Sequence, residues 1–199
     1  DGLVALGNTP VRVNKWMLAV QKRLLDEGGN VAGLPASREF PRPPKPIGAS
    51  EEVDKAWRKE CVNIHRKNIG NASRYYSLFQ CHAVATEFEN EPTLYMPHQL
   101  DFRGRTYARP IGLNHFGPDA PRSLLQFSEA RDGDDVLTQV AIQCATMYGH
   151  NKISFHERIE WTKDHAREIA MSARDPFNTG FWREADEPLQ FLAACKAFM

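Results

Sequence analysis

The sequence predicts a mainly helical protein with a small β element near its middle. Most of its 199 residues fall into segments whose apolar side chains recur at helical spacing, bounded by residues typical of helix ends. The stretch 95–109 instead reads as an extended strand. Residues 30–48 contain five prolines and two glycines, a composition that excludes a helix there.

The first helix is predicted to begin at Thr9-Pro10 and to end at Gly28-Gly29. Thr is a favoured N-cap, and proline is tolerated at the first helical position because the N–H that it lacks would be unpaired there. Glycine is common just after a helix end. The Pro-rich residues 30–48 are expected to form an extended linker.

Two further helices are predicted before Pro92. One begins at Ser50, whose following acids suit the positive end of a helix dipole, and it weakens at Gly70. The next runs from about residue 73 to residue 88, with apolar side chains in register.

The most informative stretch, 95–109, reads Tyr-Met-Pro-His-Gln-Leu-Asp-Phe-Arg-Gly-Arg-Thr-Tyr-Ala-Arg. Alternate side chains of a strand share a face, so one face of this strand would carry Asp101, Arg103, Arg105, Tyr107 and Arg109. Guanidinium groups bind phosphates, and aromatic rings stack on bases. Two interpretations stay open: a nucleic-acid surface, or an exposed edge strand whose charges prevent pairing with other chains.

The rest of the chain is expected to be helical between loops. In chain order we expect an apolar stretch at 124–127, a turn at Asp132-Gly133, and helices over 134–148, over 154–173 and from Pro188 onward. Ser154 and Glu157 have the spacing of a capping box, in which each residue satisfies the backbone N–H of the other.

Composition and residue spacing argue against a membrane-spanning protein and against a metal site built from Cys or His. The net charge is zero, but residues 55–110 carry nine Lys/Arg against five acids, so positive charge is concentrated locally. No apolar run is long enough to span a membrane. The four cysteines form no CxxC pair and the histidines no HExxH pattern, so we expect no metal site built from these residues.

Each basic residue outside the predicted strand has two possible roles. Arg66, Lys67 and Arg74 could contact a nucleic-acid backbone or lie on a solvated helix face. Arg122 could reach a phosphate or pair with a nearby carboxylate. Lys152, just before a helix N-terminus, could bind a phosphate or be a surface residue of a turn.

The motif at 95–109 resembles the Asp-aromatic-Arg-Gly-Arg-x-Tyr segment of single-subunit DNA-directed RNA polymerases, the bacteriophage and mitochondrial type. Further segments resemble the same family in the same order: Asn8–Lys15, Gly117-Pro118-Asp119 with Arg122–Phe127, Phe155–Ile159 and Trp182–Pro188. The resemblance covers nearly all of the chain.

The resemblance implies the fold of a right-hand nucleotide polymerase, with multi-helical thumb and partial palm. Residues 1–92 would be the end of the N-terminal domain and the thumb helices, with the linker at 30–48. Residues 93–199 would be the first part of the palm. The thumb segment 66–74 is sparser in Lys and Arg than in the family.

The resemblance also implies the roles of the site residues. It puts Arg103 and Arg105 by the template and the RNA–DNA hybrid, and Lys152 near the phosphates of the incoming nucleotide. It puts Asp101, Phe102 and Tyr107 beside these two arginines, and Arg122 near the nucleic acid. The nucleic-acid contacts of the thumb would come from Arg66, Lys67 and Arg74.

This family transfers nucleotides with two Mg²⁺ ions held by two Asp, and its catalytic Asp segments would follow Met199. We therefore expect no catalytic residue and no metal ligand in this chain, which would be an inactive fragment of a longer enzyme. The implied partners are a DNA template, an RNA transcript and nucleoside triphosphates, with no membrane and a monomeric state. The implied location is the cytoplasm of a phage-infected bacterium or, alternatively, the mitochondrial matrix.

Two other hypotheses remain. The chain could be a stand-alone nucleic-acid-binding module without catalysis. It could also be a helical scaffold whose arginines are paired with carboxylates.

Overall fold

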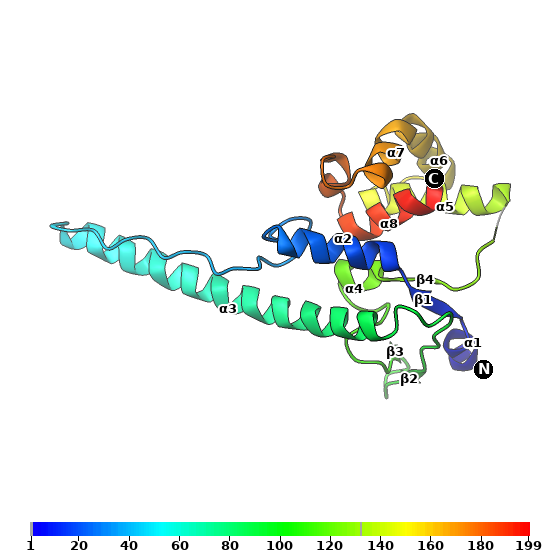
Figure 1. Ribbon diagram of the computed structural model, residues 1–199, viewed down its shortest axis with the longest axis horizontal. Helices are drawn as coiled ribbons and strands as arrows, with labels where there is room; N and C mark the ends of the chain where they lie inside the picture. Colours follow the sequence, from blue (N-terminus) through cyan, green and yellow to red (C-terminus); the bar gives the residue numbers. More distant parts are fainter. Residues whose placement is uncertain (1, 132) are drawn as a thin grey trace.

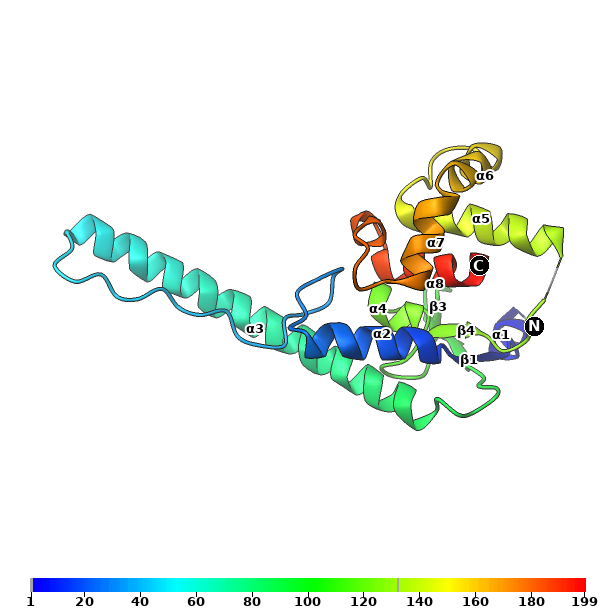
Figure 2. The ribbon, with the colours of Figure 1, turned by 45° about the horizontal axis from the view of Figure 1, so that its top comes forward.

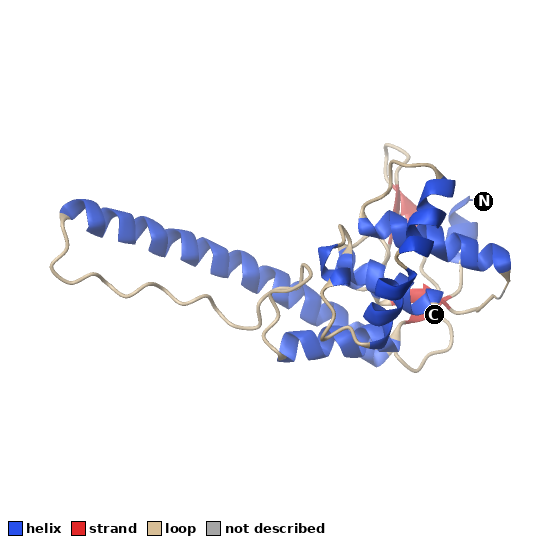
Figure 3. Ribbon diagram, turned by 90° about the horizontal axis from the view of Figure 1, so that it is seen from above, coloured by secondary structure: helices blue, strands red, loops and turns tan. Residues whose placement is uncertain are grey.

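The computed structural model describes residues 2–131 and 133–199, so the predicted turn at Asp132-Gly133 lies partly outside the described residues. Its helices are α1 (Gly2–Gly7), α2 (Lys15–Asp26), α3 (Glu51–Glu87), α4 (Asp119–Ser123), α5 (Asp134–Tyr148), α6 (Phe155–Asp164), α7 (Ala166–Arg174) and α8 (Pro188–Phe198), with a short 3₁₀ helix, η1, at Phe181–Glu184. In this described part, antiparallel pairs join β1 (Val11–Val13) to β4 (Leu125–Phe127) and β2 (His98–Leu100) to β3 (Thr106–Ala108). The predicted fold class, mainly helical with a small β element, is confirmed (Figure 3).

Helix α3 projects from a body formed by the other elements (Figures 1 and 2). Its 37 residues make a rod about 55 Å long at 1.5 Å per residue. The Ser50 hydroxyl caps it by accepting from the Val53 N–H at 3.5 Å. Leu78, Cys81 and Ala85 near its other end are buried against the body, so packing at one end anchors the whole arm.

The predicted division of this region into two helices is wrong, because α3 continues through Gly70. Gly70 has no positive φ, and a Cβ added to it would meet nothing within 4 Å. Glycine costs a helix only about 1 kcal/mol relative to alanine, which a long cooperative helix tolerates. The glycine therefore weakens α3 without ending it.

The Pro-rich linker 30–48 is not helical, as predicted, and after a turn at 31–33 it runs alongside α3 (Figure 2). Side chains of α3 hold it there, among them Trp57, whose indole N–H donates to the carbonyl of Pro43 at 3.1 Å. Asn71 donates to the carbonyl of Ala36 and accepts from its N–H, both at 2.8 Å. Asn68 makes the same pair of bonds to Phe40, at 3.0 and 2.9 Å. Each asparagine amide thus pairs with both the N–H and the C=O of one linker residue, as a peptide group of a neighbouring strand would.

The predicted helix start at Thr9-Pro10 is also wrong. The chain extends first as β1, and α2 begins after Asn14, whose side-chain oxygen accepts from the Met17 N–H at 3.1 Å. Strand pairing decides this outcome, since Val11 bonds to Leu94 as well as lying opposite Phe127. The predicted end at Gly28-Gly29 is confirmed, because α2 ends at Asp26 and both glycines have positive φ.

The core lies where α2, α5, α7 and α8 meet. Met17 of α2, Ile169 of α7 and Phe191 of α8 are fully buried, together with Trp182 of η1. Burial of side chains of this size contributes about 1.5–3 kcal/mol each. Trp182 also donates its indole N–H to the carbonyl of Pro176 at 2.8 Å, so its polar atom is satisfied.

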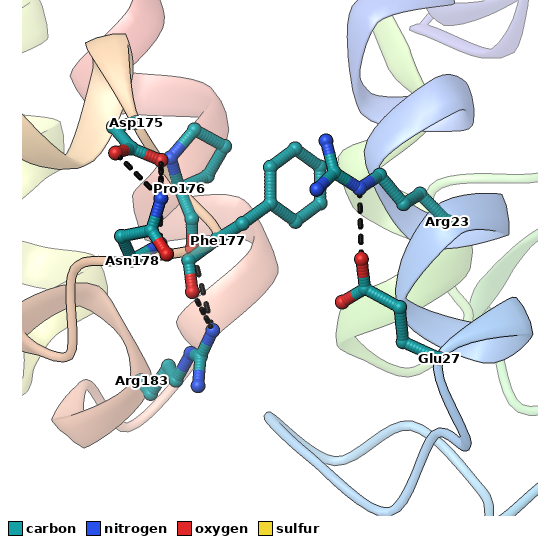
Figure 4. Close-up of polar contacts among 7 residues, drawn as sticks. All are labelled: Arg23, Glu27, Asp175, Pro176, Phe177, Asn178 and Arg183. Carbon is teal, nitrogen blue, oxygen red and sulfur yellow. Dashed lines mark hydrogen bonds and ion pairs between the residues drawn. The ribbon is translucent and has the colours of Figure 1, made fainter.

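A loop after α7 packs against α2 (Figure 4). The Arg23 guanidinium lies 3.7 Å from the ring centroid of Phe177 while its Nε donates to Glu27 at 2.8 Å. On the other side of the loop, Arg183 donates to the carbonyl of Phe177 at 2.8 Å. These contacts join the helix that leads into the linker to the C-terminal helices.

The helix predicted over 154–173 is two helices, α6 and α7, separated at His165. The His165 Nδ1 lies 2.8 Å from the carbonyl oxygen of Trp161, and the two rings stack with centroids 4.4 Å apart. The backbone N–H of His165 keeps its bond to the same carbonyl at 3.1 Å, so the chain changes direction at His165 without losing this bond. The predicted helices over 134–148 and from Pro188 are confirmed as α5 and α8.

Candidate nucleic-acid interface

The stretch 95–109 forms a hairpin rather than the single strand that the sequence predicted. Its strands are β2 and β3, with His98 opposite Ala108 and Leu100 opposite Thr106. Residues 101–105 form the turn between them, and we call residues 98–108 the arginine hairpin. The expected alternation of Asp101, Arg103 and Arg105 on one face is therefore wrong. A turn gathers these residues instead.

Asp101 holds this turn together. Its Oδ1 accepts from the backbone N–H groups of Arg103 and Arg105, both at 2.9 Å, and its Oδ2 accepts from the Arg103 guanidinium at 3.0 and 3.1 Å. The bond from the Arg105 backbone contributes most to lowering the pKa of Asp101, and bonds from Arg103 and the Tyr107 hydroxyl add to it. Gly104 has φ +76, a conformation that glycine adopts without strain.

The turn presents its remaining side chains to solvent. Phe102 is 96% exposed, and the side chain of Arg103 is 53% exposed although it is paired with Asp101. Arg105 is exposed and forms no ion pair within residues 2–131 and 133–199. Tyr107 is partly exposed on β3. An aromatic ring and two guanidiniums are thus accessible at one tip, a combination that suits bases and phosphates.

Arg122, at the end of α4, lies near the base of the arginine hairpin. Its positive charge helps to lower the pKa of His115, although burial and His98 contribute more. The nearby carboxylate of Asp119 is bonded elsewhere. It accepts from the backbone N–H groups of Leu189 and Gln190 at 2.7 and 2.9 Å, and so caps α8 from a distance.

Three predicted basic residues lie on α3. Arg66 and Arg74 are exposed. The Lys67 ammonium lies 3.6 Å from the ring centroid of Phe40 in the linker, so part of its interaction energy is already used within the chain. The three residues lie along the projecting arm rather than at the hairpin (Figure 1).

Lys152 is exposed in the turn between α5 and α6. The capping box predicted after it is confirmed: Glu157 accepts from the Ser154 N–H at 2.8 Å, and Ser154 accepts from the Glu157 N–H at 3.3 Å. Lys152 therefore lies beside a well-formed helix N-terminus, where an anion is stabilised.

Arg158 positions this turn, a role that the sequence did not reveal. Its guanidinium donates to the carbonyls of Ile153 and Asn151 at 3.1 and 2.7 Å and to the Thr146 hydroxyl at 3.1 Å. The carbonyls immediately before and after Lys152 are therefore both bonded to Arg158, which fixes the backbone on either side of Lys152. The only signal in the sequence was that Arg158 lies on the first turns of the capped helix.

The structure therefore brings the predicted residues into three groups. The hairpin turn and Arg122 form one group, the basic residues of α3 a second, and Lys152 a third in the α5–α6 layer. In Figure 1 the hairpin and α6 lie at opposite sides of the body, with α2 and α4 between them.

Two negative findings concern the described residues. In residues 2–131 and 133–199, no three His, Cys, Asp or Glu side chains gather as metal ligands would, so these residues do not fit a metal centre. In the same ranges, every helix is too short or too polar to cross a bilayer.

Comparisons with known proteins agree on one family. A family model described as DNA-dependent RNA polymerase matches residues 131–199. Over 98% of its length the chain is 35% identical to DNA-directed RNA polymerase 2, chloroplastic/mitochondrial, of Arabidopsis thaliana, and 33% identical to DNA-directed RNA polymerase 1, mitochondrial, of Nicotiana sylvestris. Over 94% of its length it is 33% identical to the DNA-directed RNA polymerase of Enterobacteria phage T3. The chain spans 20% of each plant protein and 22% of the phage protein.

Proposed function

We propose that this chain, which is homologous over nearly its whole length to single-subunit DNA-directed RNA polymerases of the organellar and phage type, is the part of such an enzyme that holds the template and the RNA–DNA hybrid. One observation carries the proposal. The turn centred on Asp101 exposes Phe102, Arg103 and Arg105 together at the tip of the arginine hairpin. The Arg103 guanidinium is exposed although Asp101 holds it, and the side chain of Arg105 is exposed on the same turn, so both can reach the phosphates of a nucleic-acid backbone.

The remaining assignments extend this proposal. Residues 1–92 are the end of the N-terminal domain and the thumb, and residues 93–199 are the first part of the palm. Arg66, Lys67 and Arg74 contact the nucleic acid along the arm, and Arg122 contacts it beside the hairpin. Lys152 binds nucleotide phosphates, with its turn held by Arg158 and its charge added to the dipole of α6.

The chemistry of the complete enzyme is nucleotidyl transfer with two Mg²⁺ ions, and its partners are a DNA template, an RNA transcript and nucleoside triphosphates. Among residues 2–131 and 133–199 no cluster of side chains could hold these Mg²⁺ ions, so the proposed part of this chain in the reaction is to hold nucleic acid and nucleotide. We propose that the 199-residue chain acts as a monomer and incorporates no nucleotide by itself. Its compartment is a mitochondrion or a phage-infected bacterium, in line with the two kinds of relatives.

One observation favours the competing scaffold hypothesis, namely the ion pair between Arg103 and Asp101. A binding measurement separates the two. Replacing both Arg103 and Arg105 by Gln removes two positive charges and should weaken hybrid binding at least tenfold, because a hydrogen bond to a charged group contributes about 1.5–3 kcal/mol. The affinity is measured by fluorescence anisotropy with a labelled RNA–DNA hybrid.

Arg167→Gln is the control. Arg167 is exposed on α7, away from all three groups, and its substitution removes one positive charge. It should bind almost as the wild type does. Equal affinities of the wild type and the double variant would support the scaffold and overturn the proposal. Incorporation of labelled nucleotide by the chain alone would contradict its proposed inactivity.

A further inference from the structure

Two histidines join the arginine hairpin to the loop that leads into α4. His98 is the first residue of β2, and His115 lies between β3 and α4. Their Nε2 atoms are 3.0 Å apart and their ring centroids 4.9 Å apart. Phe116 packs beside them, with its ring centroid 4.8 Å from that of His115 and 6.3 Å from that of Tyr107.

The loop that carries His115 is itself fixed. Asn114 donates to the carbonyl of Pro110 at 2.9 Å and accepts from the Phe116 N–H at 2.9 Å. The hairpin is tied at its base by a bond from the Arg109 N–H to the carbonyl of Pro97 at 2.9 Å. The contact between His98 and His115 therefore joins two ordered segments, one leading to Arg105 and the other to Arg122.

This contact requires a particular number of protons. A hydrogen bond between two Nε2 atoms needs one N–H and one lone pair, so at least one ring must be neutral. When both rings are protonated, two N–H groups and two like charges face each other and the bond is lost. In this doubly protonated state His98 also carries an Nδ1–H donor, and this buried atom has no partner among the described residues.

The surroundings oppose the second proton as well. Burial lowers the pKa of His115, and the charges of His98 and Arg122 lower it further. The neighbouring rings are those of Phe116, which packs against both histidines, and of Tyr107 from β3, which packs against Phe116. Helix α1, which packs against β2, consists of uncharged residues.

We propose that the His98–His115 hydrogen bond is a proton-dependent link that sets the arginine hairpin relative to Arg122, so that both can contact one nucleic acid at the same time. The two histidines are positioning residues: they act through the arginines. The inference rests on the proposed function, because it assumes that these arginines bind nucleic acid. Protonation of both rings releases the hairpin from the α4 loop and separates the two groups of cations.

The direction of the resulting pH effect is diagnostic. Protonated histidines ordinarily strengthen binding to a polyanion, since they add positive charge. The proposed link has the opposite effect: affinity for an RNA–DNA hybrid should fall by about fivefold to tenfold as pH drops from 7.5 to 5.5, the low end of usual coupling between sites.

Two substitutions at one position separate the link from general packing. His115→Phe keeps an aromatic ring but removes the hydrogen bond, so its affinity should be low at both pH values. His115→Gln keeps a polar group that can bond to His98 but cannot take up a proton, so at both pH 7.5 and pH 5.5 its affinity should stay near the value that the wild type has at pH 7.5. His156→Gln, an exposed histidine of α6, is the control and should retain the wild-type pH profile.

A second measurement is independent of nucleic acid. NMR titration of the histidine ring protons in the wild-type 199-residue chain should show His98 and His115 titrating as a coupled pair, with one pKa clearly depressed. Independent titration of both rings near pH 6.5, or an affinity of His115→Phe equal to the wild type, would overturn the inference. A failure of the proposed function has a different signature, in which the pair is coupled but Arg103 and Arg105 have no effect on binding.

Discussion

Single carboxylates and amides organise the backbone of this protein at several places. Asp101 binds two N–H groups of its own turn, and Asp119 binds two N–H groups at the start of α8. The sequence indicated that Asp101 lies among the arginines, but not that it shapes their turn. The role of Asp119 could not be predicted, because its partners lie about seventy positions away and spacing reveals only local pairs.

A buried network around Gln21 leads to a prediction about pH. Gln21 is fully buried and donates to the Ser123 hydroxyl at 2.7 Å, while its Oε1 lies 2.9 Å from Nε2 of His82. Burial lowers the pKa of His82 from 6.5 to about 4, and the charge of Lys22 adds to the effect. His82 is therefore neutral at pH 7 and donates its Nε2–H to Gln21.

Because the unfolded chain binds this proton more readily, the free energy of unfolding should fall as pH drops below 6.5, by a total of about 3 kcal/mol at pH 4. The contribution is fully present above pH 6.5. Urea unfolding of the wild type and of His82→Gln between pH 4 and 8 measures it, since glutamine does not titrate. The two stability curves should converge toward acid pH, and parallel curves would contradict the assignment.

At the scale of whole elements, the long helix and its linker depart most from expectation. The linker composition correctly excluded a helix, but prolines give no sign that Ala36 and Phe40 bond to Asn71 and Asn68. Such contacts depend on which segments the rest of the fold brings together. For the same reason β1 was missed: its partner, β4, is more than one hundred positions away.

The continuity of α3 through Gly70 predicts the effect of filling that position. Gly70→Ala adds a methyl group in open space and improves helix propensity, so it should stabilise the chain by about 0.5–1 kcal/mol. Gly104→Ala is the contrasting variant. Because Gly104 has φ +76 in the hairpin turn, an alanine there should destabilise the chain. Thermal unfolding measures both. A destabilised Gly70→Ala would mean that α3 is interrupted there.

At the scale of the molecule, the predicted basic site residues of this neutral chain lie in three separate places, namely the projecting arm, the hairpin with Arg122, and the turn before α6. The motif at 95–109 resembles single-subunit DNA-directed RNA polymerases, and over 98% of its length the chain is 35% identical to one such polymerase. The arrangement of the groups was beyond the sequence. Only the fold separates Lys152 from the hairpin by the layers of α2 and α4 and puts His98 beside His115.

The most direct test of the hairpin's role is the salt dependence of hybrid binding by Arg105→Gln. Arg105 is exposed and forms no ion pair within the described ranges, so this substitution leaves the Asp101–Arg103 pair in place. If the Arg105 guanidinium contacts a phosphate, the slope of log K against log salt should become shallower by about 0.7–0.9, the value for one lost phosphate contact. Plots for the variant and the wild type that run parallel across the salt range would contradict the account.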